Sequence, residues 1–198
     1  MSDESLPPVR LCAGQQSLYK AGECGRLWRV VEGTVRLDRE AGTTRLPVSL
    51  ALPGDLIGIE VLCEQPYQFT ASAFTDCALA PVRVAGERAR QDLLRQALVQ
   101  QQVRSHDMAM LRTGSVASRL ACLLRLMGLP CQGRHTHDGL CGDTLRSALP
   151  ALRELAQMVD AQAETVCRSL AHLLPPRRRK SGPVRAALLA PAALGAPA

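Results

Sequence analysis

Apolar and polar residues alternate along the first half of the chain, in short runs that end at turn-forming residues. Four such runs predict strands: Leu27–Leu37, Arg45–Leu52, Phe69–Phe74 and Cys77–Val82. The first run is centred on Gly33, which predicts a hairpin, and the second ends at Pro53 and Gly54, a strong turn signal. Strands this short and this closely spaced favour a small barrel or roll over residues 10–85.

The period changes at Gly86, where a helical pattern begins. Glu87–Arg112 contains neither proline nor glycine and is rich in good helix formers, so it predicts one long helix. Six residues recur at heptad spacing along it: Leu94, Gln101 and Met108, and Ala97, Arg104 and Leu111. Because this stripe includes polar residues, it predicts a weak but specific coiled-coil dimer. An exposed linker helix is the alternative.

A second helix is expected just beyond this one. Gly114 interrupts the long helix, and Ser115 is suited to cap Val116–Met127. The apolar face of that helix consists of Leu120, Leu123, Leu124 and Met127. A glycine-rich loop from Gly128 to about Asp143 then precedes the next apolar pattern.

The stretch Leu152–Leu170 has the spacing of two short helices joined by a tight turn. Asp160 lies where such a turn needs a left-handed residue, a conformation that aspartate tolerates better than most residues. The inner faces are Leu155, Ala156 and Val159 on the first helix and Val166 and Leu170 on the second. This spacing is typical of a helix-turn-helix that exposes Glu164, Thr165 and Arg168, and the alternative is an ordinary helical hairpin.

Charge is distributed unevenly along the 198 residues. The net charge is +6, and from Arg146 onward eight Arg or Lys residues face three Asp or Glu residues. The basic excess therefore lies with the helix pair, which favours a nucleic-acid partner over a merely solvated basic face. With 46% hydrophobic but only 3% aromatic residues, the core must be built mainly from Leu, Val and Ala.

No apolar run reaches the length of a membrane span, and Met1–Arg10 lacks the apolar core of a signal peptide. We therefore expect a cytoplasmic protein without membrane contact, whose eight cysteines are mostly reduced. Cys122 and Cys167 fall in helical patterns, where a buried thiol behaves as a small hydrophobe. The chain carries no sequence motif of a common enzyme class, so no catalytic residue is assigned.

Several short motifs, in this order, resemble the Crp/Fnr family of bacterial transcription regulators over residues 10–190. They are Leu18–Gly22, Val31–Leu37, Leu52–Gly58, Ala73–Cys77 and Glu164–Arg168. The resemblance implies an α+β fold: an N-terminal β-roll sensor of the cyclic-nucleotide-binding, jelly-roll type (1–85), a dimerisation helix (86–113) and a C-terminal winged helix-turn-helix (114–198). It also implies a homodimer that binds palindromic, double-stranded promoter DNA, with RNA polymerase as a further candidate partner.

The effector is not expected to be cyclic AMP. Cyclic-nucleotide-binding members place a glutamate directly after a glycine, whereas here Ile59 follows Gly58 and Glu60 comes one position late. Gln65–Thr70 contains no arginine that could pair with a cyclic phosphate. Gly58–Leu62 looks more like the oxygen-sensing branch, although its closely spaced N-terminal cysteines are absent. Redox state, a gas sensed through an iron–sulfur or haem cofactor, and a metal remain open, as does the absence of any ligand.

DNA reading is assigned mainly to the second helix of the pair. Arg168 can hold guanine and Glu164 can accept from cytosine, and their spacing puts them on one helical face. The alternative is an ion pair on a solvated helix. The basic run after Pro175 would contact phosphates. The full candidate set for DNA is Arg153, Glu164, Thr165, Arg168, Ser169, Arg177, Arg178, Arg179 and Lys180.

Two features favour the alternative to a DNA-binding regulator. In this alternative the protein is a sensor or scaffold that keeps the family fold but has lost specific DNA binding. Ala161 and Gln162 occupy the place of the usual Ser or Thr helix cap, which weakens the helix start by roughly 1 kcal/mol. The wing is shortened or rebuilt over Pro175–Gly182, and Val184–Leu189 is a candidate last strand.

A separate hypothesis concerns the glycine-rich loop. Cys131, His135, His137 and Cys141 lie within one short segment and could close a tetrahedral zinc site. The spacing is not that of a standard zinc finger, so a coincidental grouping is the alternative. A cluster held by cysteines 122, 131, 141 and 167 is less favoured, because two of them lie in separate helical patterns.

Overall fold

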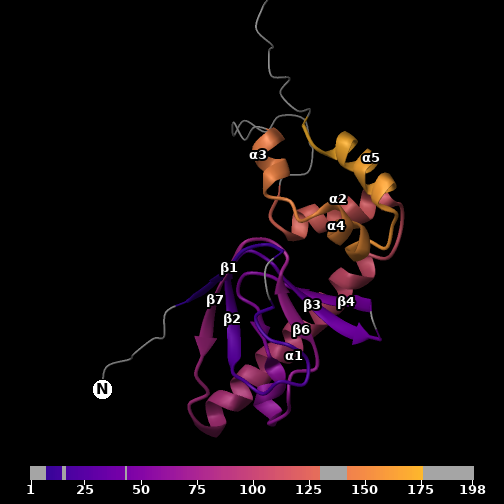
Figure 1. The fold of residues 1–198 in the computed structure, drawn as a ribbon. Helices are drawn as coiled ribbons and strands as arrows, with labels where there is room; N and C mark the ends of the chain where they lie inside the picture. The colour runs from indigo at the N-terminus through magenta and orange to yellow at the C-terminus, as the bar shows by residue number, and fades with distance from the viewer. Residues whose placement is uncertain (1–7, 15–16, 43, 130–141, 176–198) are drawn as a thin grey trace, which may run out of the picture.

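The computed structural model describes residues 8–14, 17–42, 44–129 and 142–175, with only the backbone described for 142–144. Strands gather in the lower part of Figure 1, the longest helix crosses beside them, and the shorter helices lie above. The strands are β1 (Val9–Leu11), β2 (Leu27–Glu32), β3 (Val35–Ala41), β4 (Thr44–Ala51), β5 (Leu56–Ile57), β6 (Thr70–Ala73) and β7 (Cys77–Val82). The helices are the 3₁₀ helix η1 (Ile59–Cys63) and α1 (Gly86–Met110), α2 (Val116–Leu126), α3 (Gly142–Ser147), α4 (Leu152–Met158) and α5 (Ala163–Leu173).

The strands form two antiparallel sheets, in the orders β1-β7-β2-β5 and β4-β3-β6. Their facing sides bury a core that includes Val30, Val35, Ile57, Ala71 and Leu79. Sheet-rich and helical regions follow one another along the chain, so the predicted α+β class is confirmed.

The hairpin predicted around Gly33 is wrong. β2 pairs with β5 and β7, whereas β3 pairs with β4 and β6, so the two strands belong to different sheets. Gly33 has a φ of 74° and forms the corner between them. A Cβ at this position would collide with the carbonyl oxygen of Asp76 and with Cys77, so the corner requires glycine.

Helix α1 is held against the roll by apolar and polar contacts. Leu94 packs on a cluster formed by Leu27, Leu56 and Leu62. The side-chain amide of Gln100 accepts from the backbone N–H of Leu56 (2.7 Å) and donates to its carbonyl oxygen (2.8 Å). These contacts fix how far along the roll the helix lies.

The predicted heptad stripe faces the chain's own roll and core, not a free surface. Ala97 and Leu111 are buried, Arg104 forms an ion pair with Asp55 at 2.7 Å, and only Gln101 of the six is exposed. The stripe is therefore wrong as a partner-facing surface, because sequence spacing does not say which neighbour an apolar face meets. Large apolar side chains that are exposed on α1 form another set: Leu98, Val99, Val103 and Met110.

The shorter helices follow the sequence signals with one addition. Ser115 caps α2 by accepting from the backbone N–H of Ser118 at 3.2 Å, as predicted. Helix α3 was not predicted, because it begins at the end of the glycine-rich stretch and is only six residues long. In the part of the chain that the structure describes, no helix is both long and apolar enough to cross a membrane.

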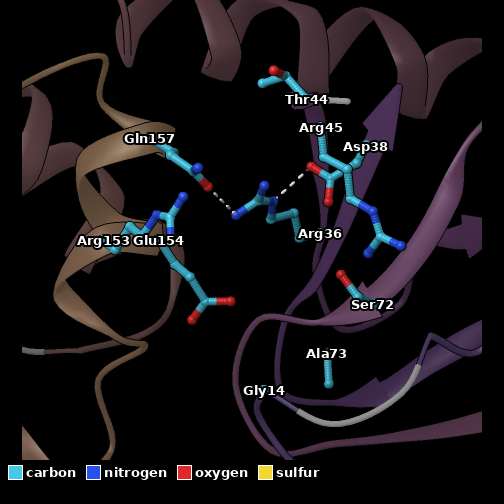
Figure 2. A pocket seen from close by; sticks show the side chains of 10 residues that line it. All are labelled: Gly14, Arg36, Asp38, Thr44, Arg45, Ser72, Ala73, Arg153, Glu154 and Gln157. Atoms are coloured by element: carbon cyan, nitrogen blue, oxygen red, sulfur yellow. Dashed lines mark hydrogen bonds and ion pairs between the residues drawn. The ribbon is translucent and has the colours of Figure 1, made fainter. Parts of the chain in front are cut away.

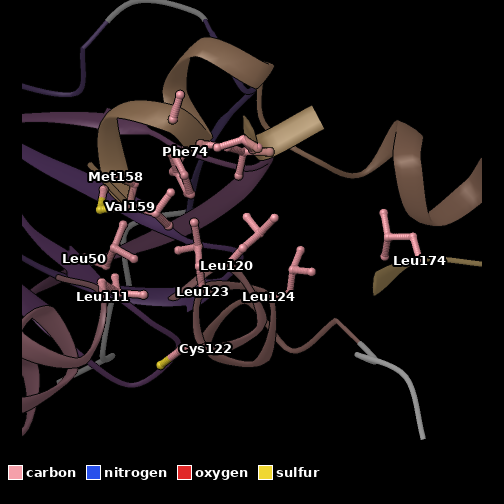
Figure 3. Packing of buried hydrophobic residues seen from close by; sticks show 13 residues of the cluster. Leu50, Phe74, Leu111, Leu120, Cys122, Leu123, Leu124, Met158, Val159 and Leu174 are labelled. Atoms are coloured by element: carbon pink, nitrogen blue, oxygen red, sulfur yellow. The ribbon is translucent and has the colours of Figure 1, made fainter. Parts of the chain in front are cut away.

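The roll and the helices share one apolar core (Figure 3). Phe74, from the end of β6, and Leu50, from β4, lie in the same cluster as residues of α2 and α4. Phe74 is completely buried there, as are Leu120, Leu123 and Met158. The helical region is thus docked on the roll through apolar side chains of both.

We predict that Phe74→Ala lowers the free energy of unfolding by about 3–5 kcal/mol, because it opens a cavity where the roll meets the helices. Phe69→Ala is the matched control, since Phe69 is only half-buried and lies outside this core. Urea unfolding followed by circular dichroism measures both variants. Equal losses for the two variants would contradict a special role for Phe74.

Candidate nucleic-acid interface

Helices α4 and α5 form the helix pair that the sequence predicted. Leu155, Ala156 and Val159 are buried on the first helix, and Val166 is buried on the second. Asp160 has a φ of 49°, the left-handed conformation expected in the turn. The inner faces therefore pack against each other and against α2, which leaves the opposite face of α5 outward.

The turn between the two helices is held by a side chain from α2. Arg119 donates from Nη1 to the carbonyl oxygens of Val159 (2.7 Å) and Asp160 (3.2 Å). These carbonyls end α4, where cationic donors are favourable. Arg119 thereby ties α2 to the turn from which α5 begins.

The outward face of α5 carries Glu164 and Arg168. Their side chains are 80% and 70% exposed and form an ion pair of 2.7 Å across one helical turn. Such a solvated pair contributes only about 0.3–0.5 kcal/mol, so either side chain can leave it for another partner at little cost. Thr165 and Ser169, also candidates for DNA contact, are half-buried.

The start of α5 lacks a side-chain cap, as the sequence predicted. Gln162 occupies the cap position and makes no side-chain hydrogen bond to the first turn. Glu164 is the acidic residue in that turn, where a negative charge favours the helix dipole. The helix begins without the usual Ser or Thr, and packing of Val166 holds it in place.

The remaining predicted site residues are placed differently. Arg153 is exposed on α4 and lines a cavity against the roll. Residues 177–180, the wing segment and the Cys131, His135, His137 and Cys141 set lie outside the described residues. Within the described ranges, no group of three or more His, Cys, Asp or Glu residues is arranged to hold a metal.

The cysteines in the described residues are all free thiols. Cys122 is buried, as its helical pattern predicted, but Cys167 is exposed, so its expected burial is wrong. Its exposure follows from its place beside Val166, which alone turns inward at that turn of α5. Burial is the largest cause that raises the pKa of the Cys77 thiol, to about 11, so this thiol stays protonated and unreactive near neutral pH.

Two stacked tyrosines belong to the core of the roll, and Val61 of η1 packs against the same core. The rings of Tyr19 and Tyr67 lie 3.8 Å apart and both are buried. The Tyr67 hydroxyl donates to the carbonyl oxygen of Arg26 (2.6 Å) and accepts from its N–H (2.7 Å). Gly25 and Gly58 leave room for the Tyr67 ring, since a Cβ on either would overlap it.

Glu60 of η1 is bonded to the backbone of the segment that follows. Its carboxylate accepts from the backbone N–H of Gln68 at 3.0 Å, which closes the segment after η1. Near this segment, Arg39 of β3 lies over the Phe69 ring at 5.9 Å. The sequence indicates the missing arginine, but not that Tyr19 and Tyr67 stack in the core of the roll.

Comparison with solved structures agrees with this arrangement. TTHB099, a CRP-family transcriptional regulator from Thermus thermophilus, is 26% identical over 83% of both chains, with a TM-score of 0.59. TTHA1359, a CRP/FNR-family transcriptional regulator from the same organism, is 26% identical over 83% of this chain and 84% of that one, with a TM-score of 0.52. FixK2 from Bradyrhizobium japonicum shares the fold at 18% identity, over 84% of both chains, with a TM-score of 0.59.

No protein-family model and no curated protein sequence matches this chain. The likeness rests on the order of the roll, the long helix and the helix pair together, because it spans more than four-fifths of the chain in each of the three comparisons. The predicted resemblance is confirmed: the chain has the fold of the Crp/Fnr transcription regulators.

Proposed function

We propose that the protein is a homodimeric, sequence-specific DNA-binding transcription regulator of the Crp/Fnr type whose effector is not cyclic AMP. The observation that carries this proposal is the solvated Glu164–Arg168 face of α5, which is presented by a helix packed firmly on its partner. Such a regulator acts on promoter DNA in the cytoplasm, with RNA polymerase as a candidate partner. A scaffold that has lost specific DNA binding is the competing function.

Base reading would replace the existing ion pair. A bidentate contact from Arg168 to guanine is worth about 1–3 kcal/mol of discrimination, more than an exposed intrahelical pair contributes. Glu164 would then be free to accept from the amino group of cytosine. Thr165 and Ser169, which flank this face, and Arg153 on α4 are proposed to contact the backbone of the duplex.

We expect Arg168→Ala to weaken binding to the specific duplex by about 1–3 kcal/mol per half-site and to relax specificity at one base pair. The matched control is Arg125→Ala, because Arg125 is exposed on α2 but does not share the outward face of α5. Fluorescence anisotropy with specific and random duplexes measures both proteins. If Arg168→Ala weakened binding to both duplexes equally, α5 would not read bases.

Residues 177–180 are predicted from the sequence to contact phosphates. Changing them should therefore affect DNA binding differently from Arg168→Ala. Neutralising them should weaken binding to every duplex and flatten the dependence on salt, because phosphate contacts release counterions without reading bases. A wild-type protein that binds neither duplex would favour the scaffold function.

Dimerisation is proposed to use the exposed apolar side chains of α1. Leu98, Val99 and Val103 are 63%, 61% and 48% exposed, and Met110 continues the set toward the end of the helix. Apolar side chains gathered along one helix are typical of a surface that a partner covers. A second copy of this chain fits, because two such helices can pack side by side along these residues.

Val103→Glu should therefore shift the protein from dimer to monomer, since it places a charge in an apolar interface. Val31→Glu is the control: Val31 is similarly exposed but lies on β2 of the roll. Sedimentation velocity at micromolar concentration distinguishes the two states. A monomeric wild type, or a Val103→Glu variant that stays dimeric, would contradict this interface.

Cyclic AMP is expected not to bind with useful affinity. Tyr19 and Tyr67 are stacked and buried in the roll, and Glu60 is engaged with the backbone of Gln68. A cyclic phosphate would find no charged partner in the segment 65–70. Calorimetric titration of the full chain measures this directly, and a dissociation constant in the micromolar range would show the expectation to be wrong.

A further inference from the structure

A cavity of about 420 Å³ lies between the roll and α4, outside the interior of the roll (Figure 2). Its lining comes from β3, β4 and β6 on one side and from α4 on the other. This volume is sufficient for a small metabolite. Polar and charged side chains dominate the lining, including Arg36, Asp38, Arg45, Ser72, Arg153 and Gln157.

The floor of the cavity holds a buried arginine. The side chains of Arg36 and Asp38 are only 7% and 3% exposed, and Nε of Arg36 lies 2.6 Å from the carboxylate. Nη1 of Arg36 donates to Oε1 of Gln157 at 3.0 Å, which links the roll to α4. Among the described residues Nη2 has no hydrogen-bond partner, so the guanidinium retains donors for a molecule in the cavity.

Two further guanidinium groups line the cavity from its two sides. Arg45 comes from β4 and Arg153 from α4, and both side chains are exposed. Neither forms an ion pair with any residue in the described ranges. Asp38 is paired with Arg36, whereas Glu154 accepts from the backbone N–H of Ala151 at 3.1 Å and keeps its negative charge. The three arginines of the lining outnumber the two carboxylates, so the cavity carries a formal charge of +1.

We propose that this cavity is an effector site for a small oxyanion, a metabolite bearing phosphate or carboxylate groups. Arg45 and Arg153 would hold the anionic oxygens from opposite sides, as guanidinium groups do by paired hydrogen bonds. Nη2 of Arg36 and the hydroxyl of Ser72 would supply additional donors from the roll.

The position of Arg153 predicts whether a bound oxyanion raises or lowers the affinity for DNA. This part of the proposal rests on the proposed DNA-binding function. Arg153 belongs to the residues proposed to contact the DNA backbone and also lines the cavity. One guanidinium cannot serve both an oxyanion in the cavity and a phosphate of the duplex. Bound oxyanion should therefore lower the affinity for DNA, and DNA should lower the affinity for the oxyanion to the same extent.

The test begins without DNA, on the full chain, by calorimetric titration with pyrophosphate and separately with citrate at constant ionic strength. We expect saturable binding of one of them at a single site per chain, and the one that binds identifies phosphate or carboxylate as the recognised group. Arg45→Gln should weaken that binding about tenfold, as expected for the loss of a charged hydrogen bond. Arg45 is exposed, so the variant is expected to fold.

Arg39→Gln is the matched control, because Arg39 lies on the same roll with the same charge but does not line the cavity. Its affinity for the oxyanion should equal that of the wild type. No saturable binding of either probe, or equal losses for the Arg45 and Arg39 variants, would overturn the site.

DNA affinity is then measured with and without the oxyanion that binds. The oxyanion should reduce specific DNA binding roughly fivefold or more in the wild type and in Arg39→Gln, but not in Arg45→Gln. The variants separate this effect from the general weakening of DNA binding by salt. Unchanged DNA affinity in the presence of the oxyanion would overturn the effector role. A protein that binds no DNA at all would refute the proposed function, and the titration without DNA would then still decide whether the oxyanion site exists.

Discussion

Burial of Phe74 and Leu50 against α2 and α4 is the contact on which the rest of the arrangement depends. Both side chains belong to the roll, yet they lie in the core that orders the helix pair. Helix α5 has a single fully buried residue, Val166, so its orientation is inherited from the helices beneath it. The outward direction of Glu164 and Arg168 is consequently tied to the position of the roll.

Polar contacts fix the position of α1 along the roll, which apolar packing alone would not determine. Arg104 on α1 pairs with both Asp55 of the roll and Asp107 of its own helix, and Gln100 bonds both backbone groups of Leu56. Hydrogen bonds have narrow preferred geometries, whereas apolar contacts tolerate sliding. The long helix therefore meets the roll at one position, and any partner helix must use the face that remains.

Sequence signals predict a local structure correctly where that structure depends only on residues close together in the chain. The strand 77–82, the Ser115 cap and the left-handed Asp160 all agree with the structure for this reason. The pattern around Gly33 predicts a hairpin because alternation on both sides does not reveal which sheet each strand joins. The same limit applies to α1, whose spacing identified an apolar face without identifying the roll as its neighbour.

The candidate site shows this limit most clearly. Helical spacing placed Glu164 and Arg168 outward, and they are exposed. On β3, alternation with Val35 assigns Arg36 and Asp38 to the solvent side, but the docking of α4 buries them. Removing one member of such a pair leaves an uncompensated buried charge, which is strongly destabilising. The outer face of the roll is therefore part of the contact that positions the helix pair, and a ligand at this face acts where the two regions meet.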